Sequence, residues 1–418
     1  MGLWLLVPEH LRLGTWDLLT GWAGRSGRTL QQRLAMQAIH ESALCLTGMR
    51  EQRCLRHTGF ELVNGLPLLA TDTAIHDLLN NQTLRQTQQL QIALGRIRQT
   101  LGHFRGDLLA IDPHRMTSYS KRDMRRRKVH AKDRATKMAQ VFFCLDVDTH
   151  QPICCTLPTP GQNVAAGTPS LLEMATQILP VRKRTLVLAD TEHFTVENLQ
   201  QIRQGGRWDM LVPMPQQPYV RQRLEQIPDD QFTPRWAGYA TTQVPYDLLQ
   251  DGQTPLTMIV QRSGETPEQS TRKAFVCTID GPEVDAVTRD FPKRWHVEEF
   301  FNIYQDMGWR RAGTQNLHIR YGRMSLALIA QAATAMLRQR LDRMTATWDA
   351  RHLASEVLGG MEGDIRVRDD TILVTYYNAP MPDRLRTQYE HLPERLEAEH
   401  VDPRIPWLYG FKLDFRFK

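Results

Sequence analysis

Three carboxylates occupy places where α/β proteins commonly put their reactive groups. Asp112 and Asp190 each close a run of aliphatic residues and are expected at the ends of strands, whereas Glu298 lies in a predicted helix. Carboxylate oxygens are the hard ligands that Mg²⁺ prefers, so carboxylates from separate chain segments could together hold this cation. An aspartate after a hydrophobic strand is also commonly a helix cap or a turn residue, and for Asp112 or Asp190 alone that interpretation is the stronger one.

The segment around Glu298 gives a sharper pattern. DFPKRWHVEEFFNIYQDMGW predicts one amphipathic helix from about 290 to 307, begun by Asp290 and Pro292. At about 100° per residue, four side chains share an arc of about 60° beside the buried face: Phe291, Arg294, Glu298 and Gln305. On the same helical wheel, Glu299 points away from this arc and from the buried face. The alternative is an ordinary surface pair of Arg294 with Glu298 at i,i+4, which would contribute little.

This segment resembles the Y-x2-R-x3-E-x6-K signature of DDE transposases of bacterial insertion sequences. Its spacing matches at Phe291, Arg294, Glu298 and Gln305, and its residue types match at Arg294 and Glu298. Phe291 keeps a ring but lacks the signature's hydroxyl, and Gln305 keeps a donor but lacks the charge of lysine. The family also has an aspartate closing the first core strand, a strand-terminal aspartate before a helix, and a strand-rich insertion before the glutamate. Asp112, Asp190 and residues 216–285 match this layout.

The resemblance implies a chemistry. Asp112, Asp190 and Glu298 would be the catalytic residues and would ligate two Mg²⁺ ions, with Mn²⁺ able to substitute, while Phe291, Arg294 and Gln305 would bind DNA. Two such ions can activate the attacking oxygen and stabilise the leaving one in phosphodiester transfer. The implied partners are double-stranded DNA, as terminal inverted repeats and as target, and a second copy of the chain in a homodimer. Cleavage through a hairpin at the transposon end is a further implication.

Several alternatives stay open at this point. Asp146 and Asp148 alternate with Val147 and compete with Asp112 as the first ligand, although Asp112 is favoured because the resembled fold takes this ligand from its first core strand. Trp295 could stack on an unpaired base, but we expect it to pack against the strand-rich insertion. Two other functions compete: an RNase H-like nuclease without strand transfer, and a catalytically impaired, transposase-derived DNA-binding protein.

The positive charge is concentrated in one stretch. Residues 121–137 hold nine Lys or Arg against two Asp, a net +7, so the rest of the chain sums to −1 within the total of +6. Such a patch is typical of phosphate binding, and a solvated basic loop is the alternative. The residues that we expect to contact DNA here are Lys121, Arg122, Arg125, Arg126, Arg127 and Lys128.

The predicted elements give an α/β chain. We expect a helical N-terminal domain over 1–102 that binds DNA ends, and a catalytic core over 103–340 interrupted by the β-rich insertion at about 216–285. The last part, 341–418, is a C-terminal region with a possible role in dimerisation. From about 105 the order is three strands, then helix, strand, helix, strand, which predicts an RNase H-like mixed sheet. An apolar helix, Ser325 to Leu337, is expected to be a buried scaffold.

Composition excludes several classes of protein. With 41% hydrophobic and 23% charged residues in 418, the chain is typical of globular proteins. No apolar stretch reaches the roughly 20 residues of a membrane span. The first residues lack the basic region of a secretory signal, so we expect a cytoplasmic protein. The resemblance to transposases of bacterial insertion sequences implies that it is bacterial and associated with the nucleoid. The six cysteines form no CxxC pair and predict neither a zinc site nor a disulfide framework.

Overall fold

The computed structural model describes most of the chain, in two compact units. The described residues are 1–24, 29–46, 59–118, 121, 124, 126–128, 134–157, 163–180, 185–246, 256–264, 266, 269–279, 284–309 and 316–418. We call Gly102–Arg115 with Gln140–Phe300 the sheet unit. Met1–Leu101, Met116–Ala139 and Phe301–Lys418 form the helical unit. Each unit is described by itself.

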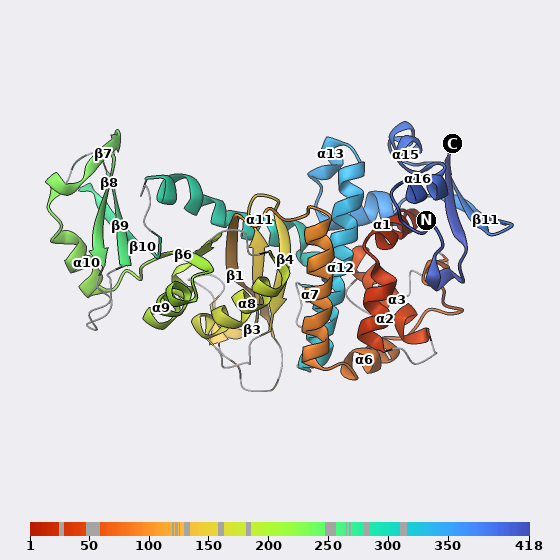
Figure 1. The fold of residues 1–418 in the computed structure, drawn as a ribbon, viewed down its shortest axis with the longest axis horizontal. Helices are drawn as coiled ribbons and strands as arrows, with labels where there is room; N and C mark the ends of the chain where they lie inside the picture. The colour runs from red at the N-terminus through yellow and green to blue at the C-terminus, as the bar shows by residue number, and fades with distance from the viewer. Residues whose placement is uncertain are drawn as a thin grey trace. The chain divides into compact units, whose positions relative to one another are not determined.

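The sheet unit holds most of one large mixed sheet (Figure 1), of which β2 and residues 136–139 of β3 are counted in the helical unit. Its main path runs β3-β1-β5-β6-β10-β9-β8-β7, with β4 paired to the other side of β3 and a short β2 at its start. β5 is parallel to β1 and β6, whereas β10 is antiparallel to β6. The strands are β1 (Leu108–Thr117), β2 (Arg126–Arg127), β3 (Thr136–Asp146), β4 (Gln151–Thr156), β5 (Thr185–Ala189), β6 (Trp208–Pro213), β7 (Thr233–Trp236), β8 (Tyr239–Tyr246), β9 (Leu256–Ser263) and β10 (Thr271–Cys277).

Two helices pack against the strands that form the central part of the sheet. α8 (Val164–Ile178) and α9 (Val196–Gly205) begin at Asn163 and Thr195, whose side chains cap the first turns. α8 approaches β3 so closely that a Cβ at Gly167 would lie 1.9 Å from the Phe142 ring. β6 is buried along its whole length, which is typical of central parallel strands and explains their nearly continuous hydrophobic sequences.

The predicted succession of elements is present. β1, β3 and β4 are followed by α8, β5, α9 and β6, which is the order of three strands, helix, strand, helix, strand. The predicted strand-rich region is present as well, as β7 to β10 with α10 (Pro218–Glu225) and the turn η4 (Asp229–Gln231). These strands do not form a sheet of their own. They extend the core sheet, because Phe275 to Cys277 of β10 pair with Pro213 to Leu211 of β6.

The predicted single helix from about 290 to 307 is wrong in detail. The chain is helical there, but only α11 (His296–Tyr304) is an α-helix. A π-helical turn, η6 (Asp285–Asp290), precedes it, and the 3-10 turns η7 (Phe291–Trp295) and η8 (Gln305–Met307) flank it. Pro292 in η7 has no N–H to donate, and helix ends commonly tighten into 3-10 turns.

The helical unit combines helices from both ends of the chain around α12 (Leu317–Arg340). The predicted scaffold stretch within α12, Ser325 to Leu337, is buried at every residue, and α12 packs against α3 and α7. The other helices before it are η1 (Gly2–Leu6), α1 (Val7–Arg12), α2 (Thr15–Ala23), α3 (Leu30–Ala43), α5 (Phe60–Val63), α6 (Asp72–Asn80) and α7 (Leu84–Thr100).

The C-terminal part of the helical unit holds a three-stranded sheet. Its order is β11 (Gly363–Arg368), β12 (Thr371–Tyr376) and β13 (Lys412–Phe417). Around it lie α13 (Arg343–Ala346), α14 (Ala350–Leu353), η9 (Ala354–Gly359), α15 (Pro382–Tyr389), α16 (Leu392–Ala398) and η10 (Pro406–Leu408).

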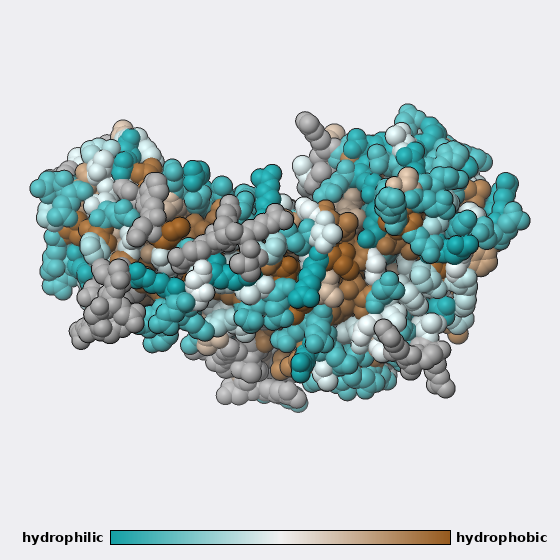
Figure 2. All heavy atoms as spheres, in the orientation of Figure 1, coloured by the Kyte–Doolittle hydropathy of each residue, from teal (hydrophilic) through white to brown (hydrophobic). Residues whose placement is uncertain are grey.

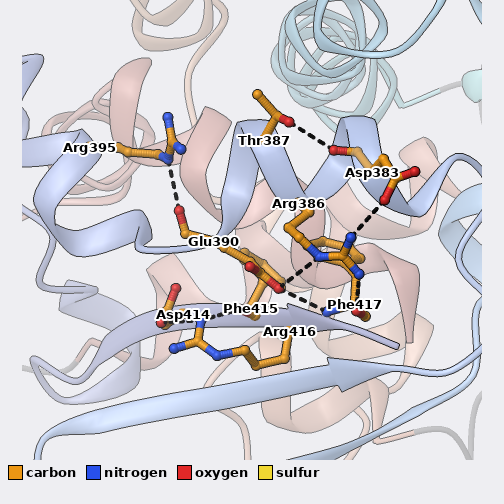
Figure 3. Close-up of polar contacts among 9 residues, drawn as sticks. All are labelled: Asp383, Arg386, Thr387, Glu390, Arg395, Asp414, Phe415, Arg416 and Phe417. Carbon is orange, nitrogen blue, oxygen red and sulfur yellow. Dashed lines mark hydrogen bonds and ion pairs between the residues drawn. The ribbon is translucent and has the colours of Figure 1, made fainter.

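Hydrogen bonds tie the C-terminal sheet to its helices and to the start of the chain. Arg386 of α15 donates to the Phe417 carbonyl of β13 at 2.7 Å (Figure 3). The buried Tyr389 hydroxyl donates to Glu9 at 3.0 Å, and the Trp407 indole donates to the Val63 carbonyl at 2.9 Å. The two ends of the sequence therefore share one hydrophobic core.

The surface is polar where Figure 2 displays it. Hydrophilic residues cover most of the visible face of each unit. Among the described residues, none of the helices combines the length and the apolar character that crossing a membrane requires.

Candidate active site

Asp112 lies on β1, and Asp190 directly follows the neighbouring parallel strand β5. The last paired residues of β1 and β5 are Ile111 and Ala189, and each aspartate is the next residue of its chain. Asp112 does not close its strand as predicted, because β1 continues to Thr117. The pairing with β5 does end there, since β5 stops at Ala189. Asp190 follows β5 as predicted.

Arg294 joins Asp112 to Glu298. Its Nη1 donates to Asp112 Oδ1 at 3.2 Å, and its Nη2 donates to Glu298 Oε1 at 3.3 Å. The side chains of Arg294 and Asp112 are each 15% exposed, so this contact is well shielded from water. The i,i+4 pair of Arg294 and Glu298 is therefore present, and it is part of a larger cluster that includes a carboxylate from β1.

Electrostatic interactions link all three carboxylates. The pKa of Asp112 is raised from 3.8 to about 7, chiefly because the group is buried. The negative charges of Asp190 and Glu298 raise this pKa further, whereas Arg294 and Arg115 lower it. A carboxylate that is costly to ionise beside two others marks a place where added positive charge stabilises the cluster. We refer to Asp112, Asp190 and Glu298 as the carboxylate cluster.

The segment after Asp190 is fixed by a cap and a buried histidine. Asp190 Oδ1 accepts a hydrogen bond from the Glu192 N–H at 2.6 Å and so caps the turn η3 (Thr191–His193). His193 is buried, and its Nδ1 lies 2.8 Å from Thr168 Oγ1 of α8. Burial lowers the pKa of His193 to about 3. Asp190 is thus both a turn cap and a member of the carboxylate cluster.

Asp146 and Asp148 do not join the cluster. Asp146 is fully buried and accepts four hydrogen bonds, from the N–H groups of Arg105, Gly106 and Thr149 and from the Thr149 hydroxyl. Both of its oxygens therefore hold the β3–β4 turn and the start of β1 together. Asp148 lies beyond the end of β3 and pairs with Lys293 at 4.0 Å. The geometry favours Asp112 over both.

Two aromatic residues flank Arg294 in different surroundings. The Phe291 ring contacts the Phe275 ring of β10 edge to face, with centroids 4.8 Å apart. This contact fixes the chain on the sheet just before Arg294. Trp295 has 55% of its surface exposed. Trp295 is therefore more exposed than covered, and its packing against the strand-rich region stays a prediction.

The other predicted DNA-binding residues lie in the helical unit. Gln305 is half-buried at the start of η8. In the basic stretch, Lys121, Arg126 and Lys128 are exposed, and β2 pairs Arg126 and Arg127 with Lys137 and Thr136 of β3. Arg122 and Arg125 lie outside the described residues. The carboxylate cluster belongs to the sheet unit.

Three cations near the cluster were missed by sequence reasoning. Arg115 of β1 donates to Glu192 and acts on the charge of Asp112. Lys293 precedes Arg294 and pairs with Asp148, and Lys273 Nζ lies 5.8 Å from the centre of the Phe291 ring. Arg115 lies three residues after Asp112, and this position was the signal in the sequence that could have found it. The signal was missed because the strand was predicted to end at Asp112.

Comparison with known proteins gives one family. A family model described as a transposase DDE domain matches residues 103–332, more than half of the chain, and these residues include the whole carboxylate cluster. No curated protein matches. A solved structure with similarity is the cryo-EM structure of the piggyBac transposase synaptic complex with hairpin DNA, at 10% identity and a TM-score of 0.48, covering 84% of this chain and 80% of that one.

Proposed function

The chain belongs to the transposase DDE domain family, and on that premise we propose that it cleaves and joins DNA phosphodiester bonds at the ends of an insertion sequence. The observation that carries the proposal is the shared guanidinium of Arg294. It holds Asp112 of β1 and Glu298 of α11 together, one strand away from Asp190. Asp112 and Glu298 thus share one guanidinium, and Asp190, which follows the strand next to β1, is near enough for its charge to act on Asp112.

The carboxylate cluster fits divalent cations such as Mg²⁺ or Mn²⁺. Its donors are hard carboxylate oxygens, and burial together with the charges of Asp190 and Glu298 raises the pKa of Asp112, so a bound cation would favour its ionised form. Asp112, Asp190 and Glu298 would hold the ions. When bound, a pair of such ions polarises the phosphodiester and activates the attacking oxygen. Asp146 is unsuited to this role because its oxygens are already occupied by four donors.

Arg294 has two roles in this proposal. In the absence of DNA its positive charge keeps Asp112 and Glu298 close, against their mutual repulsion. A guanidinium binds phosphate with the same fork of donors that it offers to carboxylates, so Arg294 would exchange a carboxylate for a DNA phosphate on substrate binding. Lysine at this position would supply the charge but not the fork that spans two partners.

The remaining residues position the cluster and the DNA. The Phe291–Phe275 contact sets where η7 leaves the sheet, so the signature's ring keeps a packing role without its hydroxyl. Lys273 beside that ring offers a positive charge of the kind that Gln305 lacks. The exposed Trp295 is available to stack on an unpaired base. The basic residues 121–128 would contact the DNA backbone outside the cluster.

The wider assembly follows the resemblance of the segment at 291–305. We propose that the substrate is double-stranded DNA with terminal inverted repeats, that a hairpin forms at the cleaved end, and that a homodimer holds two ends. The N-terminal helices would bind the DNA ends, and the C-terminal region would take part in dimerisation. A basic stretch with a net charge of +7 supports binding to a polyanion.

A strand-transfer assay with labelled transposon ends tests the function. Wild-type protein with Mg²⁺, pre-cut ends and a target plasmid should give joined product, and uncut ends should give cleavage followed by joining. Hydrolysed ends without joined product would show a nuclease instead. DNA that is bound by the protein but neither cut nor joined would show a DNA-binding protein that has lost catalysis.

A further inference from the structure

A second cluster of metal-ligand side chains lies on another face of the helix that carries Glu298. His296 and Glu299 are three residues apart in α11 and so lie on one face of it. His150 comes from the turn between β3 and β4. One ligand atom from each of these three residues lies within 4.8 Å of the other two. Glu299, which the helical pattern directed away from the carboxylate cluster, belongs to this second group.

We propose that His150, His296 and Glu299 bind a divalent transition-metal ion. Two imidazoles and one carboxylate are a ligand set for zinc, iron, cobalt or nickel rather than for Mg²⁺, which prefers oxygen ligands alone. The set leaves coordination positions open for water. It differs in chemistry from the carboxylate cluster, so the two sites would select different ions.

The hydrogen bonding of His296 prepares it as a ligand. Its Nδ1 lies 3.0 Å from the Val147 carbonyl oxygen, which can only accept. Nδ1 must therefore carry the proton, and Nε2 keeps its lone pair for a metal. A backbone carbonyl that fixes the tautomer in this way is the usual support of a histidine ligand.

The other two ligands are close enough to complete the site. His150 Nδ1 lies 3.8 Å from Glu299 Oε2, and the rings of His150 and His296 are stacked with centroids 4.0 Å apart. Two ligands that bind one ion at about 2.1 Å are at most about 4.2 Å apart, so a pair of atoms at the 4.8 Å limit must draw together by about 0.6 Å. The exposed Glu299 side chain and a rotation of the His150 ring can supply this movement.

The backbone of the turn supports a built site. His150 has φ of 55°, in the left-handed region that is uncommon for residues other than glycine. The fully buried Asp146 holds the same turn through both Thr149 donors. The turn thus presents His150 against α11 at a fixed place, and an ion would cross-link the turn to the first turn of that helix.

The test is calorimetric titration of Zn²⁺ into the full chain at saturating Mg²⁺. To exclude the carboxylate cluster, the background carries Asp112→Asn and Glu298→Gln. We expect one Zn²⁺ per chain in this background, and a Kd at least about 10-fold weaker after His150→Gln is added. His352→Gln, which removes an exposed histidine of the helical unit, serves as the matched control and should leave the Kd unchanged.

A thermal-shift measurement guards against misfolded variants. Zn²⁺ should raise the Tm of the background protein but not that of the His150→Gln or Glu299→Gln derivative, while the metal-free Tm values stay similar. Absence of Zn²⁺ binding to the background would overturn the proposal. So would binding that His150→Gln and Glu299→Gln leave unchanged.

Discussion

The guanidinium of Arg294 lies 3.2 Å from the carboxylate of Asp112, although 182 residues separate them in sequence. The same group donates to Glu298 one helical turn away. One arginine thus connects the first core strand with the helix that carries the glutamate. The predictions below follow from the charges and hydrogen bonds around this contact.

Replacement of Arg294 should separate the effect of charge from that of geometry. Arg294→Ala leaves Asp112 and Glu298 without their shared cation, so we expect a loss of about 1–3 kcal/mol in the free energy of unfolding at pH 8. Arg294→Lys should recover part of this stability but not strand transfer, because an ammonium cannot span both partners. Urea denaturation and strand-transfer rates check the two effects. Equal strand-transfer rates for Arg294→Lys and wild type would contradict the bridging role.

Asp112 should destabilise the metal-free protein at high pH. Its pKa is about 7 in the folded chain against 3.8 unfolded, so its stabilising contribution is present below pH 3.8 and is lost as the pH rises through 7. The free energy of unfolding of Asp112→Asn should therefore exceed that of wild type by about 1–2 kcal/mol at pH 8. At pH 4 the two free energies should be similar. Saturating Mn²⁺ should stabilise wild type more than the variant. A difference in unfolding free energy between Asp112→Asn and wild type that does not change with pH would contradict the raised pKa of Asp112.

Asp146 should be structural, whereas its neighbour Asp148 should be dispensable for folding. Asp146→Asn places an amide where four donors converge, and we expect a loss of about 2–4 kcal/mol in the free energy of unfolding. Asp148→Asn removes a weak, partly exposed pair with Lys293 and should change it by less than about 0.5 kcal/mol. Chemical denaturation measures both. Similar changes in the free energy of unfolding for the two variants would show that the buried hydrogen bonds of Asp146 stabilise the fold no more than the pair of Asp148 with Lys293.

His193 should contribute to acid sensitivity. Its pKa is about 3 in the folded chain against 6.5 unfolded, so its contribution to stability is present above pH 6.5 and is lost as the pH falls towards 3. Between pH 7.5 and 5, wild type should lose about 2 kcal/mol more than His193→Gln. The exposed His352 provides the control, because His352→Gln should track wild type. Parallel pH curves for His193→Gln and wild type would exclude the buried neutral state.

Local patterns were sufficient for part of this site. The spacing of Arg294 and Glu298 is set within one helical segment, and Asp190 follows β5 and caps the next turn, as its sequence setting predicted. The end of β1 was misjudged because the polar residues after Asp112 mask a strand that continues to Thr117. Hydrophobic patterning shows which residues are buried, but not where pairing with a neighbouring strand stops.

Contacts between distant segments could not be predicted from one sequence. Nothing near Arg294 specifies Asp112, and nothing near Glu299 specifies His150, since each pair meets only through the order of strands in the sheet. The shared core of the two chain ends, where Tyr389 reaches Glu9, is a contact of the same kind. The 3-10 turns on both sides of α11 also depend on packing, because the amphipathic pattern continues through them.

The rate of strand transfer by Glu298→Gln, compared with Glu197→Gln, tests the central claim most directly. Glu197 is exposed in the first turn of α9 in the same unit, so the two variants make the same chemical change at different places. With DNA-end binding shown to be intact, we predict a loss of at least about 1000-fold for Glu298→Gln and wild-type rates for Glu197→Gln. Strand transfer by Glu298→Gln at the wild-type rate would contradict the assignment of the carboxylate cluster as the catalytic site.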